Sequence, residues 1–168
     1  MSEPEVWLRG ALPDVAPLLQ PVGHSLLQCR LEVRATVPTL ASTELWVTPG
    51  GAASPGYHVR HAIGSLDRLF TYARGEQLSR EQLSALREEG RMDEREDIQA
   101  TLVTEFDVAV ERALAQLRST DPTTLLEPRE VGRARLPSTV LGLLFHAAEH
   151  TQRHVGQLVT TAKVVRGR

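Results

Sequence analysis

Three histidines follow one another at steps of four residues near the C-terminal end of the sequence, at His146, His150 and His154. In an α-helix, each step of four turns the side chain by about 40° and raises it by about 6 Å. Neighbouring histidines of this series therefore share one face and can both bind a zinc ion at about 2 Å. The first and the third lie about 12 Å apart along the axis, which is too far for both to reach one ion. The spacing thus predicts a metal site that uses one adjacent pair.

A third ligand has to come from another element, and two further histidines are available. His58 and His61 lie three residues apart in an earlier segment with its own helical pattern. Three histidines with open positions for water or substrate are typical of a catalytic metal centre rather than a closed structural one. Spacing alone leaves open which of these two is the ligand, and whether the later pair is His146 with His150 or His150 with His154.

Other interpretations of the same residues carry less weight. The run His146-Ala-Ala-Glu149-His150 matches the H-x-x-E-H pattern of inverted zinc peptidases, in which the glutamate is the general base. That pattern fixes only three positions, and the chain is far shorter than the peptidases that use it. A di-iron carboxylate bundle would need paired Glu-x-x-His motifs, which this sequence lacks. A lone histidine is more often an ordinary surface or core residue, but the regular series argues against that alternative here.

Helix-sized segments between the prolines must position these histidines. Ser54 followed by Pro55 is a typical helix start before the first histidine pair, and Gly75 ends that helix. Ser138 is the predicted N-cap of a last helix that runs without a break through the later series. We expect helices over approximately residues 14–40, 54–74, 79–89, 93–119 and 138–165.

The predicted fold class is all-α. The segment 93–119 carries the clearest amphipathic stripe, with apolar residues at steps of three and four. No alternation with a period of two indicates a strand, so we expect no sheet. Four long helices and one short one predict a four-helix bundle with a core of Leu, Val and Ala. The length of 168 residues suits a single domain over residues 1–168.

Composition excludes several classes of protein. Hydrophobic residues make up 41% and charged residues 24%, which is typical of soluble globular domains. The net charge is −2 and no basic stripe is present, so nucleic acid is not an expected partner. No apolar run approaches the roughly 20 residues that a membrane helix needs, and the acidic N-terminus does not resemble a secretory signal. The single cysteine, Cys29, fits a reducing compartment, and we expect a cytoplasmic protein.

Two segments of the sequence resemble the DinB-like superfamily, which includes the YfiT-type proteins. Residues 54–75, SPGYHVRHAIGSLDRLFTYARG, resemble the second helix of that family around its first metal-binding histidine, which corresponds to His61. Residues 146–157, HAAEHTQRHVGQ, resemble its last-helix signature of two histidines four apart followed by Gly-Gln. The matching positions are His150 and His154. The resemblance covers nearly the whole chain and implies that these three histidines are the metal ligands.

This resemblance implies a bundle with a long crossover connection, often homodimeric, that holds one divalent ion, commonly zinc or nickel. Some relatives are thiol-dependent transferases or isomerases that use bacillithiol or mycothiol, and others are suspected hydrolases. A divalent ion that lowers the pKa of bound water or thiol serves either reaction. We therefore expect a metal-dependent hydrolase or thiol-dependent S-transferase or isomerase that acts on a small electrophilic molecule. The alternative is a non-catalytic, metal-stabilised dimer that serves as a binding or stress-response module.

The sequence gives weaker evidence for a role of other residues near the predicted ligands. His58 either contacts the site from behind or faces solvent, and we favour solvent. His146 and Tyr57 either line a pocket or belong to the core. Glu149 points about 100° away from the adjacent ligand, which weakens it as a base. Cys29 has no base at local spacing and is expected to be an inert buried thiol.

Charged residues around the predicted site are expected to have ordinary roles. Asp67, Arg68 and Arg153 flank the histidines, and such residues usually form ion pairs rather than substrate contacts. The charge-dense segment 76–99 is interpreted as a solvated surface segment.

Overall fold

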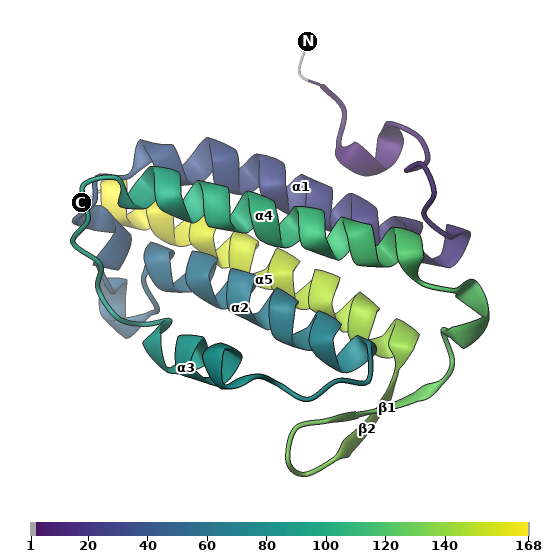
Figure 1. The fold of residues 1–168 in the computed structure, drawn as a ribbon. Coiled ribbons are helices and arrows are strands. Elements are labelled where there is room, and N and C mark those ends of the chain that lie inside the picture. The colour runs from purple at the N-terminus through teal and green to yellow at the C-terminus, as the bar shows by residue number, and fades with distance from the viewer. Residues whose placement is uncertain (1–2, 168) are drawn as a thin grey trace.

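Four long helices pack along one another in the computed structural model, which describes residues 3–167 (Figure 1). They are α1 (Gln20–Thr36), α2 (Pro55–Ala73), α4 (Ile98–Ser119) and α5 (Val140–Arg166). α5 packs most extensively against α2 and also against α1, while α4 contacts both α1 and α2. The predicted all-α four-helix bundle is therefore confirmed.

The connection between α2 and α4 is long and contains the short helix α3 (Arg80–Glu88). It returns along the length of the bundle, so α2 and α4 point in one direction while α1 and α5 point in the other (Figure 1). The expected crossover and the expected extra helix are thus both present. Because α3 packs on α2, the crossover brings the residues that follow α3 close to the first histidine pair.

A small antiparallel hairpin lies between α4 and α5, and the sequence pattern does not predict it. Its strands are β1 (Pro128–Val131) and β2 (Leu136–Thr139). The chain turns between them through Gly132 and Arg135, which have φ values of +67° and +51°. Each strand has only four residues and none of them is buried, so neither strand shows an apolar alternation. The prediction that the chain has no sheet is wrong at this point.

Local signals set the starts of the two helices that carry the histidines. The Ser54 hydroxyl caps α2 by accepting a hydrogen bond from the backbone N–H of Tyr57 (3.2 Å), and Pro55 occupies the first turn as predicted. α5 is capped by the side chain of Thr139 and not by Ser138. The predicted cap is wrong by one residue: both residues lie in strand β2, and it is Oγ1 of Thr139 that accepts a hydrogen bond from the backbone N–H of Gly142 at 3.0 Å.

Two helices are shorter than the sequence pattern predicts. The segment 14–40 is α1 flanked by 3₁₀ turns at Pro17–Leu19 and Val37–Thr39. Proline lacks an amide hydrogen and fixes φ, which favours such turns over a continuous α-helix. α4 begins at Ile98, five residues later than predicted, because the preceding residues form a loop that packs on α2.

The core lies between the four long helices and consists mainly of leucine, valine and alanine. The predicted stripe of α4 is buried along its whole length, at Ile98, Leu102, Phe106, Val110, Leu114 and Leu117. Each buried side chain of this size stabilises the fold by roughly 1.5–3 kcal/mol. No helix among residues 3–167 combines the length and the apolar character needed to cross a membrane.

Candidate metal centre

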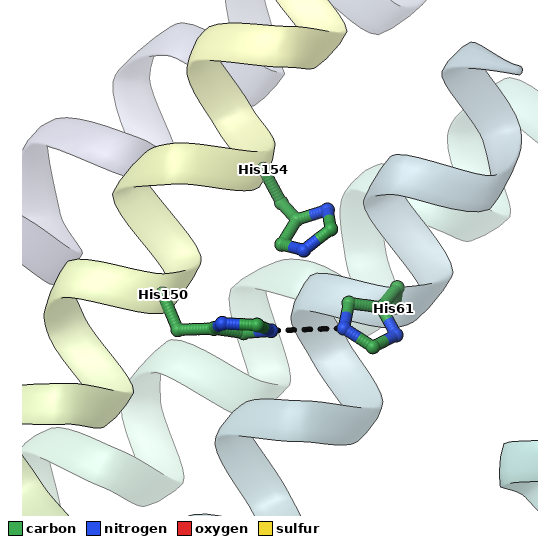
Figure 2. Close-up of side chains that lie close together, drawn as sticks. All are labelled: His61, His150 and His154. Atoms are coloured by element: carbon green, nitrogen blue, oxygen red, sulfur yellow. Dashed lines mark hydrogen bonds between the residues drawn. The ribbon is translucent and has the colours of Figure 1, made fainter. Parts of the chain in front are cut away.

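His61 of α2 points across the helix interface toward His150 and His154 of α5 (Figure 2). One ligand atom from each of the three residues lies within 4.8 Å of the other two. Nε2 of His61 and Nε2 of His150 are 2.9 Å apart. Two nitrogens bound to one tetrahedral ion at 2.0–2.1 Å are separated by about 3.3 Å, which is close to the observed distance. The three histidines thus form a set that could hold a metal ion.

The surrounding helices hold these side chains in place. α5 is continuous through the site, so His150 and His154 lie on consecutive turns of one face. Their helix is anchored by Thr151 and Val155, which are buried beside them. Ala62, next to His61, is buried on α2 and carries only a methyl group. The close packing of α2 on α5 then brings the third histidine opposite the pair.

The electrostatic environment favours neutral imidazole, the form that binds metal. Burial, together with the neighbouring His61, lowers the pKa of His154 to about 4. The same two causes lower the pKa of His150. Nδ1 of His150 is buried without a hydrogen-bond partner among the described residues, whereas its Nε2 faces Nε2 of His61 at 2.9 Å. Imidazole nitrogens suit divalent zinc, copper, iron and nickel alike, so this donor set fits a transition-metal ion.

A comparison with protein families decides the classification. The model of the DinB superfamily matches residues 25–158. The chain belongs to the DinB superfamily. The match includes all of α2 and the part of α5 that carries the histidines, and it confirms the resemblance inferred from the two sequence segments. No curated protein matches the chain significantly.

Two further aromatic residues contact the histidines of this DinB-superfamily site. His58 is buried, with Nδ1 lying 3.1 Å from Nδ1 of His154, so the favoured expectation that it faces solvent is wrong. It turns inward because α2 presents that face to α5. Burial, and then the proximity of His61, lower the pKa of His58, which keeps this ring neutral as well. Tyr57 stacks on His61 with 5.4 Å between the ring centroids and 15° between the planes.

His146 and Glu149 lie at the surface, outside the DinB-superfamily histidine cluster. About half of the His146 side chain is exposed, and its Nδ1 is 3.2 Å from the Glu149 carboxylate. Glu149 also accepts a hydrogen bond from Arg153, which lowers the pKa of the carboxyl group. His146 is therefore neither a core residue nor a member of the converging set. The peptidase arrangement, with Glu149 beside a zinc ion on the preceding pair, is not formed.

Glu89 is the site residue that the sequence interpretation missed. It lies just after α3, in the segment expected to be solvated, yet only 5% of its surface is exposed. Its Oε2 lies 2.7 Å from Nδ1 of His61, and its Oε1 accepts a hydrogen bond from Arg68 at 2.7 Å. Burial opposes ionisation of Glu89, but the hydrogen bonds from these two partners outweigh it and hold the pKa below its usual range. Arg68 was expected to form an ordinary ion pair. It does form an ion pair, with Glu89, but this pair is buried.

One sequence signal points toward the contact that Glu89 makes with α2. Gly64 stands inside the predicted helix, three residues after His61, and a glycine there costs helix stability. Such a glycine often marks the close approach of another group. A Cβ atom at Gly64 would lie 2.5 Å from Oε1 of Glu89. The sequence could thus have indicated a close contact on this face, but not which residue makes it.

Proposed function

We propose that the chain is a metal-dependent enzyme in which His61, His150 and His154 bind one divalent ion, zinc or nickel. The observation that carries the proposal is the convergence of the three ligand atoms within 4.8 Å from two helices. Membership of the DinB superfamily supports it. The lowered pKa values of His150 and His154 support it as well, because both rings are neutral near pH 7.

The protein's own contribution is to hold three donors in place while leaving coordination positions open. When bound, the ion would lower the pKa of a coordinated water or thiol and so supply a nucleophile. Tyr57 restrains the His61 ring by stacking on it, and His58 restrains His154 through the contact between their Nδ1 atoms. We propose hydrolysis, or S-transfer from a thiol such as bacillithiol or mycothiol, on a small electrophilic substrate.

Metal content is the first test of this proposal. Protein purified without chelator or affinity nickel should carry about one zinc or nickel ion per chain. His61→Ala, His150→Ala and His154→Ala should each lose the ion. His146→Ala is the matched control, because it removes an exposed histidine one turn away on the same helix, and it should retain the ion. Absence of metal from the wild type, or its retention in all four variants, would overturn the proposal.

Activity separates an enzyme from a metal-stabilised binding module. The loaded protein is assayed for hydrolysis of an activated ester, and for transfer of bacillithiol or mycothiol to a chromogenic electrophile. Turnover in either assay that disappears in His150→Ala supports the enzyme, whereas bound metal without turnover on any substrate tried favours the module. We also propose a homodimer, for which light scattering during size exclusion gives the mass directly.

A further inference from the structure

We infer that Glu89 is a positioning residue of the metal centre, which holds His61 as the tautomer protonated at Nδ1 so that Nε2 is free to bind the ion. The metal-binding half of this inference rests on the proposed function. The tautomer of His61 is a property of the protein without metal, so it can be measured even if that proposal fails.

Hydrogen-bond chemistry assigns the tautomer. An ionised carboxylate can only accept hydrogen bonds, so at 2.7 Å from Oε2 of Glu89 the Nδ1 atom of His61 must be the donor. A neutral imidazole has a single N–H, which leaves a lone pair on Nε2. That nitrogen faces Nε2 of His150 at 2.9 Å. The carboxylate thus directs the ring's acceptor nitrogen into the histidine cluster.

Arg68 keeps the Glu89 carboxylate ionised and oriented. Its guanidinium donates to Oε1 at 2.7 Å, and the side chains of Arg68 and Glu89 are only 10% and 6% exposed. Each carboxylate oxygen therefore has its own donor, one from Arg68 and one from His61. These donors are seven positions apart on α2, which places them two turns apart on one face of the helix.

Gly64 provides the space that this contact requires. It lies between His61 and Arg68 on the same face of α2. A Cβ atom there would meet Oε1 of Glu89 at 2.5 Å and Nη1 of Arg68 at 2.6 Å. Both distances are shorter than van der Waals contact, so any larger residue would displace the carboxylate or the guanidinium.

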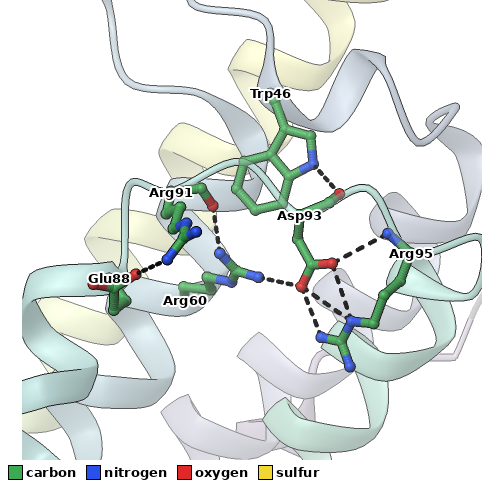
Figure 3. Close-up of polar contacts among 6 residues, drawn as sticks. All are labelled: Trp46, Arg60, Glu88, Arg91, Asp93 and Arg95. Atoms are coloured by element: carbon green, nitrogen blue, oxygen red, sulfur yellow. Dashed lines mark hydrogen bonds and ion pairs between the residues drawn. The ribbon is translucent and has the colours of Figure 1, made fainter.

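The loop that follows Glu89 is held against α2 by a second set of contacts (Figure 3). The guanidinium of Arg60 donates to the carbonyl oxygen of Arg91 at 2.5 Å and to Oδ2 of Asp93 at 2.6 Å. The indole N–H of Trp46 donates to the carbonyl oxygen of Asp93 at 3.1 Å, and Arg60 lies 4.7 Å above the Trp46 ring. Glu89 is therefore presented to His61 by an anchored segment of chain.

These contacts together form a network of hydrogen bonds and ion pairs that holds the Glu89 carboxylate against His61. Metal-binding histidines usually donate their second N–H to a carboxylate or carbonyl group, which fixes the ring and strengthens the ligand. Here α2 supplies the candidate ligand His61, the space at Gly64 and the second donor Arg68. The crossover between α2 and α4 supplies the carboxylate of Glu89. Removing such an outer partner typically weakens metal binding by roughly 10- to 100-fold.

Glu89→Gln is the sharpest variant because it should reverse the tautomer without removing atoms. Arg68 can only donate hydrogen bonds, so its guanidinium will donate to the side-chain oxygen of the glutamine at position 89. The amide NH₂ group then faces His61 and donates to Nδ1, which places the imidazole hydrogen on Nε2. Glu88→Gln is the matched control, since Glu88 is an exposed neighbour paired with Arg91.

The test is a long-range ¹H–¹⁵N spectrum of the histidine rings in labelled full-length protein, with metal removed by chelator and folding checked by circular dichroism. Wild type and Glu88→Gln should show His61 protonated at Nδ1, and Glu89→Gln should show it protonated at Nε2. A wild-type His61 that is protonated at Nε2 or on both nitrogens, or an unchanged tautomer in Glu89→Gln, would overturn the inference.

Metal binding distinguishes this inference from the proposed function. If the wild type binds zinc and Glu89→Gln binds it roughly 10- to 100-fold more weakly, both stand. If the wild type binds zinc and Glu89→Gln binds it equally well, the positioning role fails while the metal site stands. If the wild type binds no metal, the proposed function fails and the spectrum alone decides whether Glu89 sets the tautomer.

Discussion

Nε2 of His61 lies 2.9 Å from Nε2 of His150, although 89 positions separate the two residues in the sequence. Two imidazole nitrogens at this distance are stable only if one donates a hydrogen bond to the other or if a cation lies between them. Since His61 donates its Nδ1–H to Glu89, its Nε2 can only accept. Without metal, His150 must then donate from Nε2, and an ion held there would require the single hydrogen of the neutral His150 ring to sit on Nδ1.

Removal of metal should destabilise the wild type measurably. A ligand present at about 100 times its Kd stabilises the folded state by about 2.7 kcal/mol. For a domain of this size, that corresponds to a change in Tm of roughly 5–10 °C. We expect a chelator to lower the Tm of the wild type and of His146→Ala by this amount and to leave the Tm of His150→Ala unchanged. Equal shifts in all three proteins would place the metal elsewhere.

Gly64→Ala should weaken metal binding. Alanine is favoured over glycine inside a helix by up to about 1 kcal/mol, but displacement of the buried Arg68–Glu89 ion pair opposes that gain, so the Tm should not rise. The new methyl group displaces the Glu89 carboxylate, and zinc affinity should fall by roughly 10-fold. Calorimetric titration with zinc measures the affinity.

The control for that substitution is Gly156→Ala on α5. A Cβ atom at Gly156 would meet no atom within 4 Å, so this variant gains the same helix preference without moving the carboxylate. Equal zinc affinity in the two alanine variants would show that the space at Gly64 has no role in the site.

Asp93 should make the stability of the protein depend on acid pH. Hydrogen bonds from Arg95, and then the charge of Arg60, lower the pKa of Asp93 to about 2. The ionised Asp93 therefore stabilises the folded state fully above the pKa of an unfolded aspartate, about 3.9. This stabilisation is lost as the pH falls toward 2. We expect Asp93→Asn to be less stable than the wild type near neutral pH, and the difference to shrink at about pH 3.

Urea unfolding at the two pH values measures that difference. The exposed neighbour Glu94 offers the comparison, because Glu94→Gln should change stability little at either pH. A difference for Asp93→Asn that is constant from neutral to acid pH would contradict the role assigned to its charge.

Cys29 should be unreactive in the folded protein. Burial raises the pKa of its thiol to about 12, and Sγ donates to Oε1 of Gln152 at 3.2 Å. The thiolate that attacks alkylating and disulfide reagents is therefore scarce near neutral pH. We expect Ellman's reagent to label Cys29 slowly in native protein and rapidly in denaturant, and Cys29→Ala to keep its metal. Rapid labelling of the native protein would show a reactive thiol instead.

The same burial sets the direction of the alkaline pH dependence. The unfolded thiol ionises above about pH 8.5 while the folded thiol does not, so stability is complete below that pH and declines as the pH rises toward 12. Urea unfolding of the wild type beside Cys29→Ala should show this decline in the wild type alone.

Helix geometry made half of the site predictable. His150 and His154 share a face because four residues complete slightly more than one turn, and this holds wherever the helix packs. The start of α2 was predictable for the same reason, since Ser54 caps it through a contact only three residues away. Geometry left open which adjacent pair of the series binds metal, and the resemblance of two segments to a known family selected His150 and His154, with His61, as the candidate ligands.

Short strands and prolines limited the prediction of secondary structure. The hairpin at Pro128–Val131 and Leu136–Thr139 has no buried residue, so no apolar alternation marks it. The ends of α1 depend on a competition between α-helical and 3₁₀ turns at prolines, which the hydrophobic pattern does not record.

By itself, the sequence determined the helical class and a series of histidines on one face of α5, and its resemblance to a family selected His150 and His154 from that series together with His61. Only the tertiary structure showed that His58 is buried and that His146 lies at the surface. It also showed that Glu89 is buried and forms a hydrogen bond with His61. A carboxylate in a charge-dense segment is normally solvated, and Glu89 is buried because the crossover places it beside partners 21 and 28 positions away in the sequence. Such contacts depend on how the elements pack, which local periodicity does not encode.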